Sequence, residues 1–261
     1  MPKFSAHLGY LFPNVPFLQR HKLAKAAGFQ AVEGGIPDNI SIQEITKVVK
    51  EAGVYQHHFD DFRGDLSKGE FGFAALPGQE EKFKEYLLKS LEYAKALNSK
   101  VIHVAAGYVT EPITVKHHDT YVKNLRESLP LFEKAGIVAV LEPITKNTRP
   151  LYYMRSIQRA LSVIRAINSP YLKLELDIFH AQQIQGDLTT LIRDSIDDIG
   201  HIQVAQVPSR NEPDTPGEID YKYVFDLIDH VGYKGYVGLE YHPVGDTVEG
   251  LKWIKKWGYS F

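Results

Sequence analysis

Short apolar runs alternate with longer amphipathic stretches along this chain, and the change from one to the other falls repeatedly at a Gly or Asn. Each such position ends a helix-favouring stretch and is followed by β-branched or aromatic residues: Gly28, Gly53, Asn98, Gly136, Asn168, Gly200 and Gly232. Gly and Asn tolerate the left-handed backbone conformation that commonly ends a helix. The pattern therefore predicts seven helix-to-strand junctions, and the last four fall at a constant interval.

The apolar runs predict strands, and the amphipathic stretches predict helices between them. Strands are expected at residues 4–8, 31–33, 54–59, 101–105, 138–141, 172–176, 202–207 and 236–240. Helices are predicted at 80–97 and 116–134, after a capping box that begins at Ser41, and finally at 247–257. Eight strand–helix units predict an α/β fold, a single-domain (β/α)₈ TIM barrel over residues 1–261. A doubly wound open sheet is the alternative, but the chain lacks its Gly-rich phosphate loop.

The composition excludes several classes of protein. The chain has no cysteine, which rules out disulfide scaffolds, thiolate metal sites and cysteine nucleophiles, and its net charge of −2 argues against a large nucleic-acid surface. No stretch approaches the roughly 20 apolar residues that span a bilayer, and Pro13 and Pro16 break the start of the chain where a secretory signal needs an apolar run. We expect a cytoplasmic protein with a small-molecule substrate and with neither nucleic acid nor membrane as a partner. The composition leaves open whether the chain forms a homo-oligomer.

Oxygen-bearing side chains end four successive predicted strands, the fifth to the eighth. They are Glu142, Asp177, Gln203 and Glu240. In a (β/α)₈ barrel the carboxyl ends of neighbouring strands meet at the active face, so these side chains should converge. Three carboxylates at one point repel one another unless protons or a cation intervene. Salt bridges to Lys or Arg are one solution. A divalent ion is the simplest, and an all-oxygen ligand set favours Mg²⁺ or Mn²⁺.

Other side chains near the strand ends are candidate substrate contacts or structural groups. His180 lies just after the sixth strand and should overhang the same mouth. Arg210, in the loop after the seventh strand, could clamp a carboxylate or phosphate, and a salt bridge with Glu212 is the alternative. Glu33 fits a site residue and a buried, hydrogen-bonded acid equally well. Glu175 should lie in the barrel interior, paired with a cation.

Several runs at and after these strand ends carry a family resemblance. They are residues 141–144, 177–180, 201–208, 217–218, 232–241 and 245–251. Together they resemble the hydroxypyruvate isomerase family, within the wider group of xylose isomerase-like barrels, and the likeness runs from residue 6 to residue 253. Residues 203–208 are specific to the isomerase branch. Two stretches near the expected mouth, 57–61 and 105–108, depart from the family pattern, which bears on the substrate more than on the reaction type.

The resemblance implies an intramolecular isomerase that interconverts hydroxypyruvate and 2-hydroxy-3-oxopropanoate (tartronate semialdehyde). Glu142 and Glu240 would act as the two acid/base residues, by way of an enediolate. The resemblance also implies the other roles: Glu142, Asp177, Gln203 and Glu240 hold the metal, and His180 and Arg210 contact the substrate. A ketose 3-epimerase on the same scaffold is the alternative. A metal-dependent endonuclease related to the apurinic endonucleases, or a non-catalytic sugar-binding protein, fits the charge and the carboxylate set less well.

Overall fold

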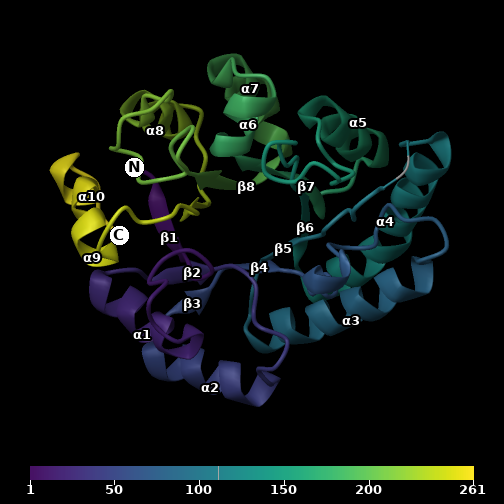
Figure 1. The fold of residues 1–261 in the computed structure, drawn as a ribbon, viewed down its shortest axis with the longest axis horizontal. Coiled ribbons are helices and arrows are strands. Elements are labelled where there is room, and N and C mark those ends of the chain that lie inside the picture. Colours follow the sequence, from purple (N-terminus) through teal and green to yellow (C-terminus); the bar gives the residue numbers. More distant parts are fainter. Residues whose placement is uncertain (111) are drawn as a thin grey trace.

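The chain forms a closed ring of parallel strands that is surrounded by helices (Figure 1). The computed structural model describes residues 1–110 and 112–261. The strands are β1 (Lys3–His7), β2 (Ala31–Glu33), β3 (Tyr55–Gln56), β4 (His58–Asp60), β5 (Val101–His103), β6 (Val138–Leu141), β7 (Leu172–Asp177), β8 (Ile199–Val204) and β9 (Tyr236–Leu239). They pair in the order β3-β2-β1-β9-β8-β7-β6-β5-β4, and every pair is parallel.

The ring closes at His57, which separates β3 from β4. The backbone of His57 continues the ladder on both sides, because its N–H donates to the Val32 carbonyl at 2.9 Å and its carbonyl accepts from the Lys100 N–H at 3.0 Å. β3 and β4 are therefore two parts of one strand. The segments together make the eight strands of a (β/α)₈ barrel, which confirms the predicted fold class.

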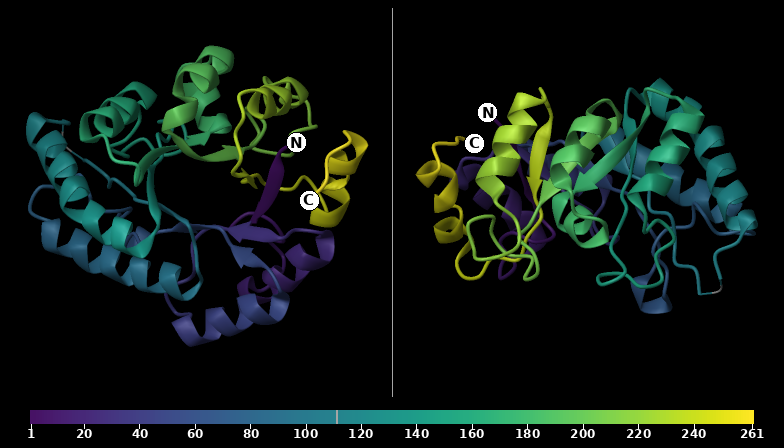
Figure 2. Two further views of the ribbon diagram at one scale, coloured as in Figure 1. Left: turned by 180° about the vertical axis from the view of Figure 1, so that it is seen from behind. Right: turned by 90° about the horizontal axis from the view of Figure 1, so that it is seen from above.

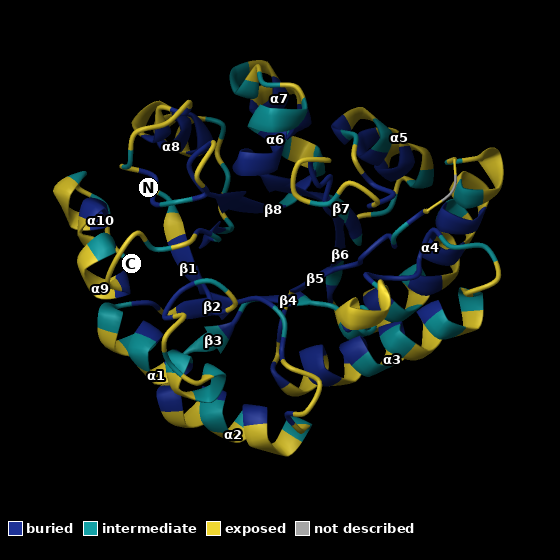
Figure 3. Ribbon diagram, viewed as in Figure 1, coloured by how far each residue is buried: buried dark blue, intermediate teal, exposed yellow. Residues whose placement is uncertain are grey.

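Helices form the outer layer of the barrel, as the views from behind and from above show (Figure 2). They are α1 (Phe17–Ala27), α2 (Ile42–Ala52), α3 (Glu80–Ala96), α4 (Val115–Ala135), α5 (Ile157–Ile167), α6 (Ile178–Ile184), α7 (Leu188–Ser195), α8 (Tyr221–His230), α9 (Thr247–Gly250) and α10 (Lys252–Lys256), with 3₁₀ turns η1 (Leu66–Lys68) and η2 (Ile196–Asp198). Their sheet-facing sides are buried and their outer sides exposed (Figure 3). The predicted last helix is split into α9 and α10 at Leu251. In the described part of the chain, no helix is both long and apolar enough to cross a bilayer.

The Gly and Asn junctions adopt the predicted conformation at all positions but one. Those with positive φ are Gly28, Gly53, Asn98, Gly136, Asn168 and Gly232. The prediction is wrong at Gly200, which lies inside β8 rather than at a helix end. A Cβ at this position would lie 2.7 Å from Lys173 Cβ and 2.9 Å from Val140 Cγ1. Gly200 is therefore required for close packing between strands, and β8 begins earlier than the sequence predicted.

Candidate active site

A cavity of about 360 Å³ opens at the carboxyl ends of the strands. Most of the predicted site residues line it: Glu142, His180, Gln203, Arg210 and Glu240. Asp177 lies against two of them, since its Oδ2 is 3.2 Å from Arg210 Nη2 and 3.4 Å from His180 Nε2. The structure thus brings all the predicted site residues together, at the face where barrels of this kind carry their catalytic groups.

Strand order sets the four candidate metal ligands along one arc of the barrel wall. Glu142 follows β6, Asp177 ends β7, Gln203 lies in β8 and Glu240 follows β9, and these strands are consecutive neighbours. Asp177 also caps α6, because its Oδ1 accepts the Phe179 backbone N–H at 2.8 Å. The cap fixes this carboxylate and leaves Oδ2 for partners at the cavity.

Arg210 supplies a positive charge within this arc. Its Nη2 lies 3.2 Å from Asp177 Oδ2 and 3.1 Å from Glu240 Oε2. These two carboxylates, and not Glu212, are its acidic partners in the described structure, and the Glu212 carboxylate accepts the Val244 backbone N–H at 3.2 Å. The salt bridge to Arg that was the alternative to a divalent ion is therefore present for two of the three carboxylates.

The clustered carboxyl groups still favour added positive charge. Burial raises the pKa of Glu142 well above its ordinary value, and the charges of Glu175, Glu240 and Asp177 raise it further. Burial also raises the pKa of Asp177 to about 7, although Arg210 opposes this shift. A divalent cation would offset both the cost of burying charged carboxylates and their mutual repulsion. The donor set therefore fits a metal ion.

Buried groups of His and carboxylate ligand atoms, each within 4.8 Å of one another, occur at three places among the described residues. They are Glu33 with His58 and His201, His103 with Glu142 and Glu175, and Glu142 with Asp177 and His180. The last group shares two carboxylates with the predicted ligand set. These groups are consistent with a divalent-metal site at the cavity, with imidazole available beside the oxygen donors.

His180 lies between two of the carboxyl groups. Its Nε2 is 3.5 Å from Glu142 Oε1 and 3.4 Å from Asp177 Oδ2. Burial lowers its pKa well below the ordinary value, and the positive charges of Arg210 and Arg149 lower it further. The imidazole is therefore neutral at pH 7 and offers one donor and one acceptor nitrogen.

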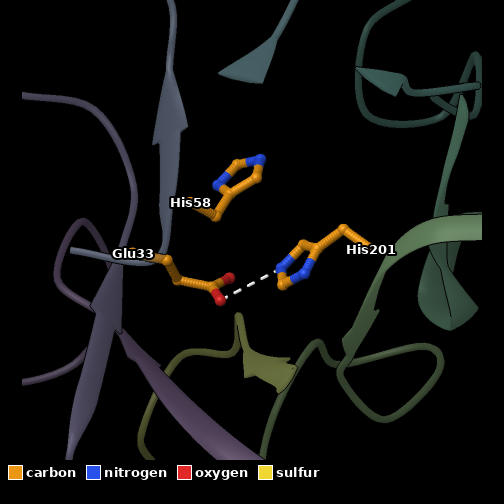
Figure 4. A group of neighbouring side chains, drawn as sticks. All are labelled: Glu33, His58 and His201. Atoms are coloured by element: carbon orange, nitrogen blue, oxygen red, sulfur yellow. Dashed lines mark hydrogen bonds and ion pairs between the residues drawn. The ribbon is translucent and has the colours of Figure 1, made fainter. Parts of the chain in front are cut away.

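Gln203 is oriented by a buried carboxylate beneath the cavity. Its Nε2 donates to Glu33 Oε1 at 3.0 Å, which leaves the amide oxygen for another partner. Glu33 is held in turn by His201, whose Nε2 is 3.1 Å from Oε2 (Figure 4). The Ser5 hydroxyl donates to the same oxygen. Glu33 is thus a buried, hydrogen-bonded acid, one of the two roles that the sequence left open. Such a supporting contact favours Gln203 as an oxygen ligand.

His58 lies beside His201 (Figure 4) and connects it to Glu175, a second buried acid. Its ring stacks on that of His201, with centroids 4.6 Å apart and planes at 12°, and its Nε2 is 3.0 Å from Glu175 Oε1. Burial lowers the pKa of His58, but the carboxylates of Glu175, Asp60 and Glu33 together raise it to about 9, with Glu175 contributing most. His58 is therefore the cationic partner expected for Glu175. Neither histidine is among the site residues predicted from the sequence. Their signal is a spacing of two residues from a cavity-lining side chain on the same strand, Asp60 for His58 and Gln203 for His201.

Histidines also contact the two candidate acid/base residues. His7 Nε2 lies 3.7 Å from Glu240 Oε1, and His103 Nδ1 lies 3.5 Å from Glu142 Oε2. His7 ends β1 and His103 ends β5. Neither histidine is among the site residues predicted from the sequence, although both lie at strand ends as the carboxylates do.

The two stretches that depart from the family pattern meet at one side of the cavity. In the first, Asp60 Oδ1 lies 3.4 Å from Arg63 Nη2. In the second, the Tyr108 hydroxyl accepts a hydrogen bond from Arg149 Nη1 at 2.7 Å. Both arginines line the cavity. No sequence pattern indicated them, because they lie in irregular loops rather than at strand ends.

Gly238, on β9, packs directly against the Glu33 carboxylate. A Cβ at Gly238 would overlap the Glu33 carboxylate. We expect Gly238→Ala to displace this carboxylate and to lower the free energy of unfolding by about 1–3 kcal/mol, as in other overpacked interiors. Urea unfolding followed by circular dichroism measures the change. Gly245→Ala is the matched control, because a Cβ there meets nothing within 4 Å. Equal stability of the two variants would contradict a need for glycine beside Glu33.

The fold and the cavity define the class of protein. A family model described as a xylose isomerase-like TIM barrel matches residues 22–257. A solved structure from Brucella melitensis, described as an AP endonuclease of family 2, is 36% identical, covers 98% of this chain and 99% of its own, and superposes with a TM-score of 0.95. The protein is therefore a xylose isomerase-like barrel.

Two relatives define the family more narrowly. The hydroxypyruvate isomerase of Escherichia coli is 36% identical over 260 residues, which cover 97% of this chain and 98% of the relative. The 2-oxo-tetronate isomerase of Haemophilus influenzae is 38% identical over 258 residues, which cover 98% and 100%. The chain belongs to the hydroxypyruvate isomerase family and is an isomerase. This confirms the resemblance found in the sequence.

Proposed function

We propose that this protein is a metal-assisted isomerase of small hydroxy-oxo acids that interconverts hydroxypyruvate and 2-hydroxy-3-oxopropanoate. One observation carries the proposal: Glu142 and Glu240 line one cavity from β6 and β9, with Asp177 and Gln203 on the two strands between them. Moving a carbonyl to the neighbouring carbon requires a proton to leave one carbon and a proton to reach the other. Two carboxyl groups at one cavity can supply both transfers.

The proton transfers balance within the substrate. One carboxylate removes a proton from C3 of hydroxypyruvate. The electron pair of the broken C–H bond forms the C2=C3 double bond of an enediolate, and negative charge moves to the C2 oxygen. The other carboxyl group delivers a proton to C2, while the hydroxyl proton on the C3 oxygen passes to the C2 oxygen. No oxidant or reductant is needed. We assign His180 and Arg210 to contacts with the substrate oxygens, because both line the cavity beside these carboxyl groups.

Glu142, Asp177, Gln203 and Glu240 would hold a Mg²⁺ or Mn²⁺ ion. When bound, such an ion polarises the substrate carbonyl and stabilises negative charge on the substrate oxygens. Arg210 orients two of these carboxylates, and Glu33 orients the Gln203 amide, so the donors are held in place by the chain itself.

Purified protein with Mg²⁺ or Mn²⁺ is expected to convert hydroxypyruvate to 2-hydroxy-3-oxopropanoate. In D₂O the product should carry deuterium at C2, because the delivered proton exchanges with solvent, and NMR measures both yield and label. Removing divalent ions with EDTA should slow the reaction by about 100-fold or more, in line with the several kcal/mol that a bound ion contributes. Adding Mn²⁺ or Mg²⁺ back should restore the rate.

The same assay separates the alternatives. Turnover of free ketoses with none of hydroxypyruvate would contradict the proposal and favour a ketose 3-epimerase. 2-Oxo-tetronate is a second candidate substrate, because a relative of that name matches nearly the whole chain, and the ratio of the two kcat/KM values decides between them. DNA with abasic sites should remain intact, because a net charge of −2 and a carboxylate-lined cavity disfavour a phosphate backbone.

A further inference from the structure

We infer that Arg149 binds the carboxylate of the substrate and so selects acids over neutral hydroxy-ketones, an inference that rests on the proposed isomerase activity. Arg149 lies in the segment between β6 and α5, which also carries Glu142. It lines the same cavity as Glu142, Gln203 and Glu240. Neither the predicted ligand set nor the predicted substrate contacts include it.

Arg149 differs from the other arginines at the cavity in its charge partners. The arginines that line the cavity are Arg63, Arg149 and Arg210. Arg210 faces Asp177 and Glu240, at 3.2 and 3.1 Å. Arg63 faces Asp60 and Asp61, at 3.4 and 3.5 Å. Within residues 1–110 and 112–261, Arg149 makes no ion pair with a carboxylate, so its positive charge is available to a ligand.

Contacts with neutral groups hold Arg149 in place. Its Nη1 donates to the Tyr108 hydroxyl at 2.7 Å, and its Cζ lies 4.1 Å from the centroid of the Phe71 ring. Its backbone N–H donates to the Thr145 carbonyl at 3.0 Å. A guanidinium has five N–H donors in a flat fork that matches a carboxylate. The Tyr108 contact uses one donor of Nη1, and the others can form the two parallel hydrogen bonds of a bidentate pair.

A second guanidinium, that of Arg63, lies at this side of the cavity. The Cζ of Arg63 lies 4.7 Å from the centroid of the same Phe71 ring. Asp60 and Asp61 compensate Arg63 locally, whereas the charge of Arg149 faces the cavity. That charge reaches His180, whose pKa it helps to lower. An anionic group bound here would place the acid end of the substrate at the side of the cavity where Tyr108 and Phe71 hold Arg149.

The test compares two substrates that differ only in this anionic group. Dihydroxyacetone is hydroxypyruvate with a hydroxymethyl group in place of the carboxylate, and its isomerisation to glyceraldehyde moves the same protons. We expect Arg149→Gln to lower kcat/KM for hydroxypyruvate by about 10- to 100-fold, the factor for losing hydrogen bonds to a charged group, and to leave dihydroxyacetone turnover within about twofold. Arg149→Lys, which keeps the charge but not the fork, should show a smaller loss.

Arg155→Gln is the matched control, because Arg155 lies on the same segment with its side chain exposed and its Nη1 bound to the Pro150 carbonyl. It should change neither substrate. Thermal unfolding of each variant checks that the fold is retained. An equal loss for both substrates in Arg149→Gln, or no loss for hydroxypyruvate, would overturn the assignment.

A binding measurement keeps this inference separate from the proposed reaction. Glycerate carries the carboxylate but has no carbonyl to isomerise, and glycerol is its neutral counterpart. Calorimetry in the presence of Mn²⁺ should detect glycerate binding to the wild type, at least about 10-fold weaker binding to Arg149→Gln, and no difference between the two proteins with glycerol. This result together with no turnover of hydroxypyruvate would refute the proposed reaction and retain the anion site. Absence of glycerate binding to the wild type, or equal binding by both proteins, would refute the anion site.

Discussion

Replacing Glu142 with Gln is expected to lower kcat for hydroxypyruvate by about 10²- to 10⁴-fold, because the amide cannot exchange a proton with the substrate. The fold should be retained. Glu142 is buried beside His103 and His180, and the raised pKa of its carboxyl favours the neutral form in the metal-free protein. A neutral amide of the same shape therefore replaces it at little cost. Initial rates measured by NMR give kcat, and thermal unfolding checks the fold.

Glu127→Gln is the matched control for this change. Glu127 lies on α4 with 66% of its side chain exposed, and it faces Lys123 rather than the cavity. Its replacement should leave kcat and stability unchanged. A Glu142→Gln variant with full activity would exclude the two-carboxylate mechanism, whatever metal the protein binds.

Replacing Glu175 with Gln is expected to lower the free energy of unfolding by about 3 kcal/mol. This is the lower end of the cost of removing one partner from a buried ion pair. Glu175 and His58 are both almost fully buried, with Oε1 and Nε2 3.0 Å apart, so the variant leaves a buried His58 without its main acidic partner. Urea unfolding at pH 6 measures the loss. The double variant with His58→Gln should recover part of it, because no unpaired buried charge remains. A loss within about 0.5 kcal/mol in the single variant would contradict a stabilising pair.

The same pair gives a defined dependence of stability on pH. The pKa of His58 rises from 6.5 to about 9 on folding, so its contribution is fully present below pH 6.5 and is lost as pH rises through 9. The pKa of Glu175 falls from 4.5, so its contribution is fully present above pH 4.5 and is lost below that, as pH falls through the folded value. The two contributions coincide between pH 4.5 and 6.5. The stability gap between wild type and Glu175→Gln should therefore narrow from pH 6 to pH 9.

Buried polar side chains inside the barrel act on two of the candidate metal ligands, Gln203 and Glu142. Glu33 holds the Gln203 amide, and the charge of Glu175 helps to raise the pKa of Glu142. The stacked imidazoles of His58 and His201 lie between these two acids and partner them. The interior thus has two roles, because the contacts that keep buried charges paired also orient a ligand and tune a proton-transfer group.

The sequence by itself determined the order of strands and helices, most of the helix ends and the residues at the strand ends. These features depend on near neighbours in the chain: the period of apolar residues, and the tolerance of Gly and Asn for positive φ. Barrel topology places the strand ends at one face, which is why strand order alone was enough to group Glu142, Asp177, Gln203 and Glu240.

Only the tertiary structure decided which side chains pair across the barrel. Glu33 and His201 are 168 residues apart and meet because strand closure and register bring their inward faces together. The same holds for Gly200, which gives room to β7 and β6, and for Arg210, whose acidic partners lie on other strands. The sequence did not indicate Arg149 either, because its role depends on residues that are distant in the chain. Its availability depends on which loop residues and carboxylates surround it, and local pattern does not encode such long-range contacts.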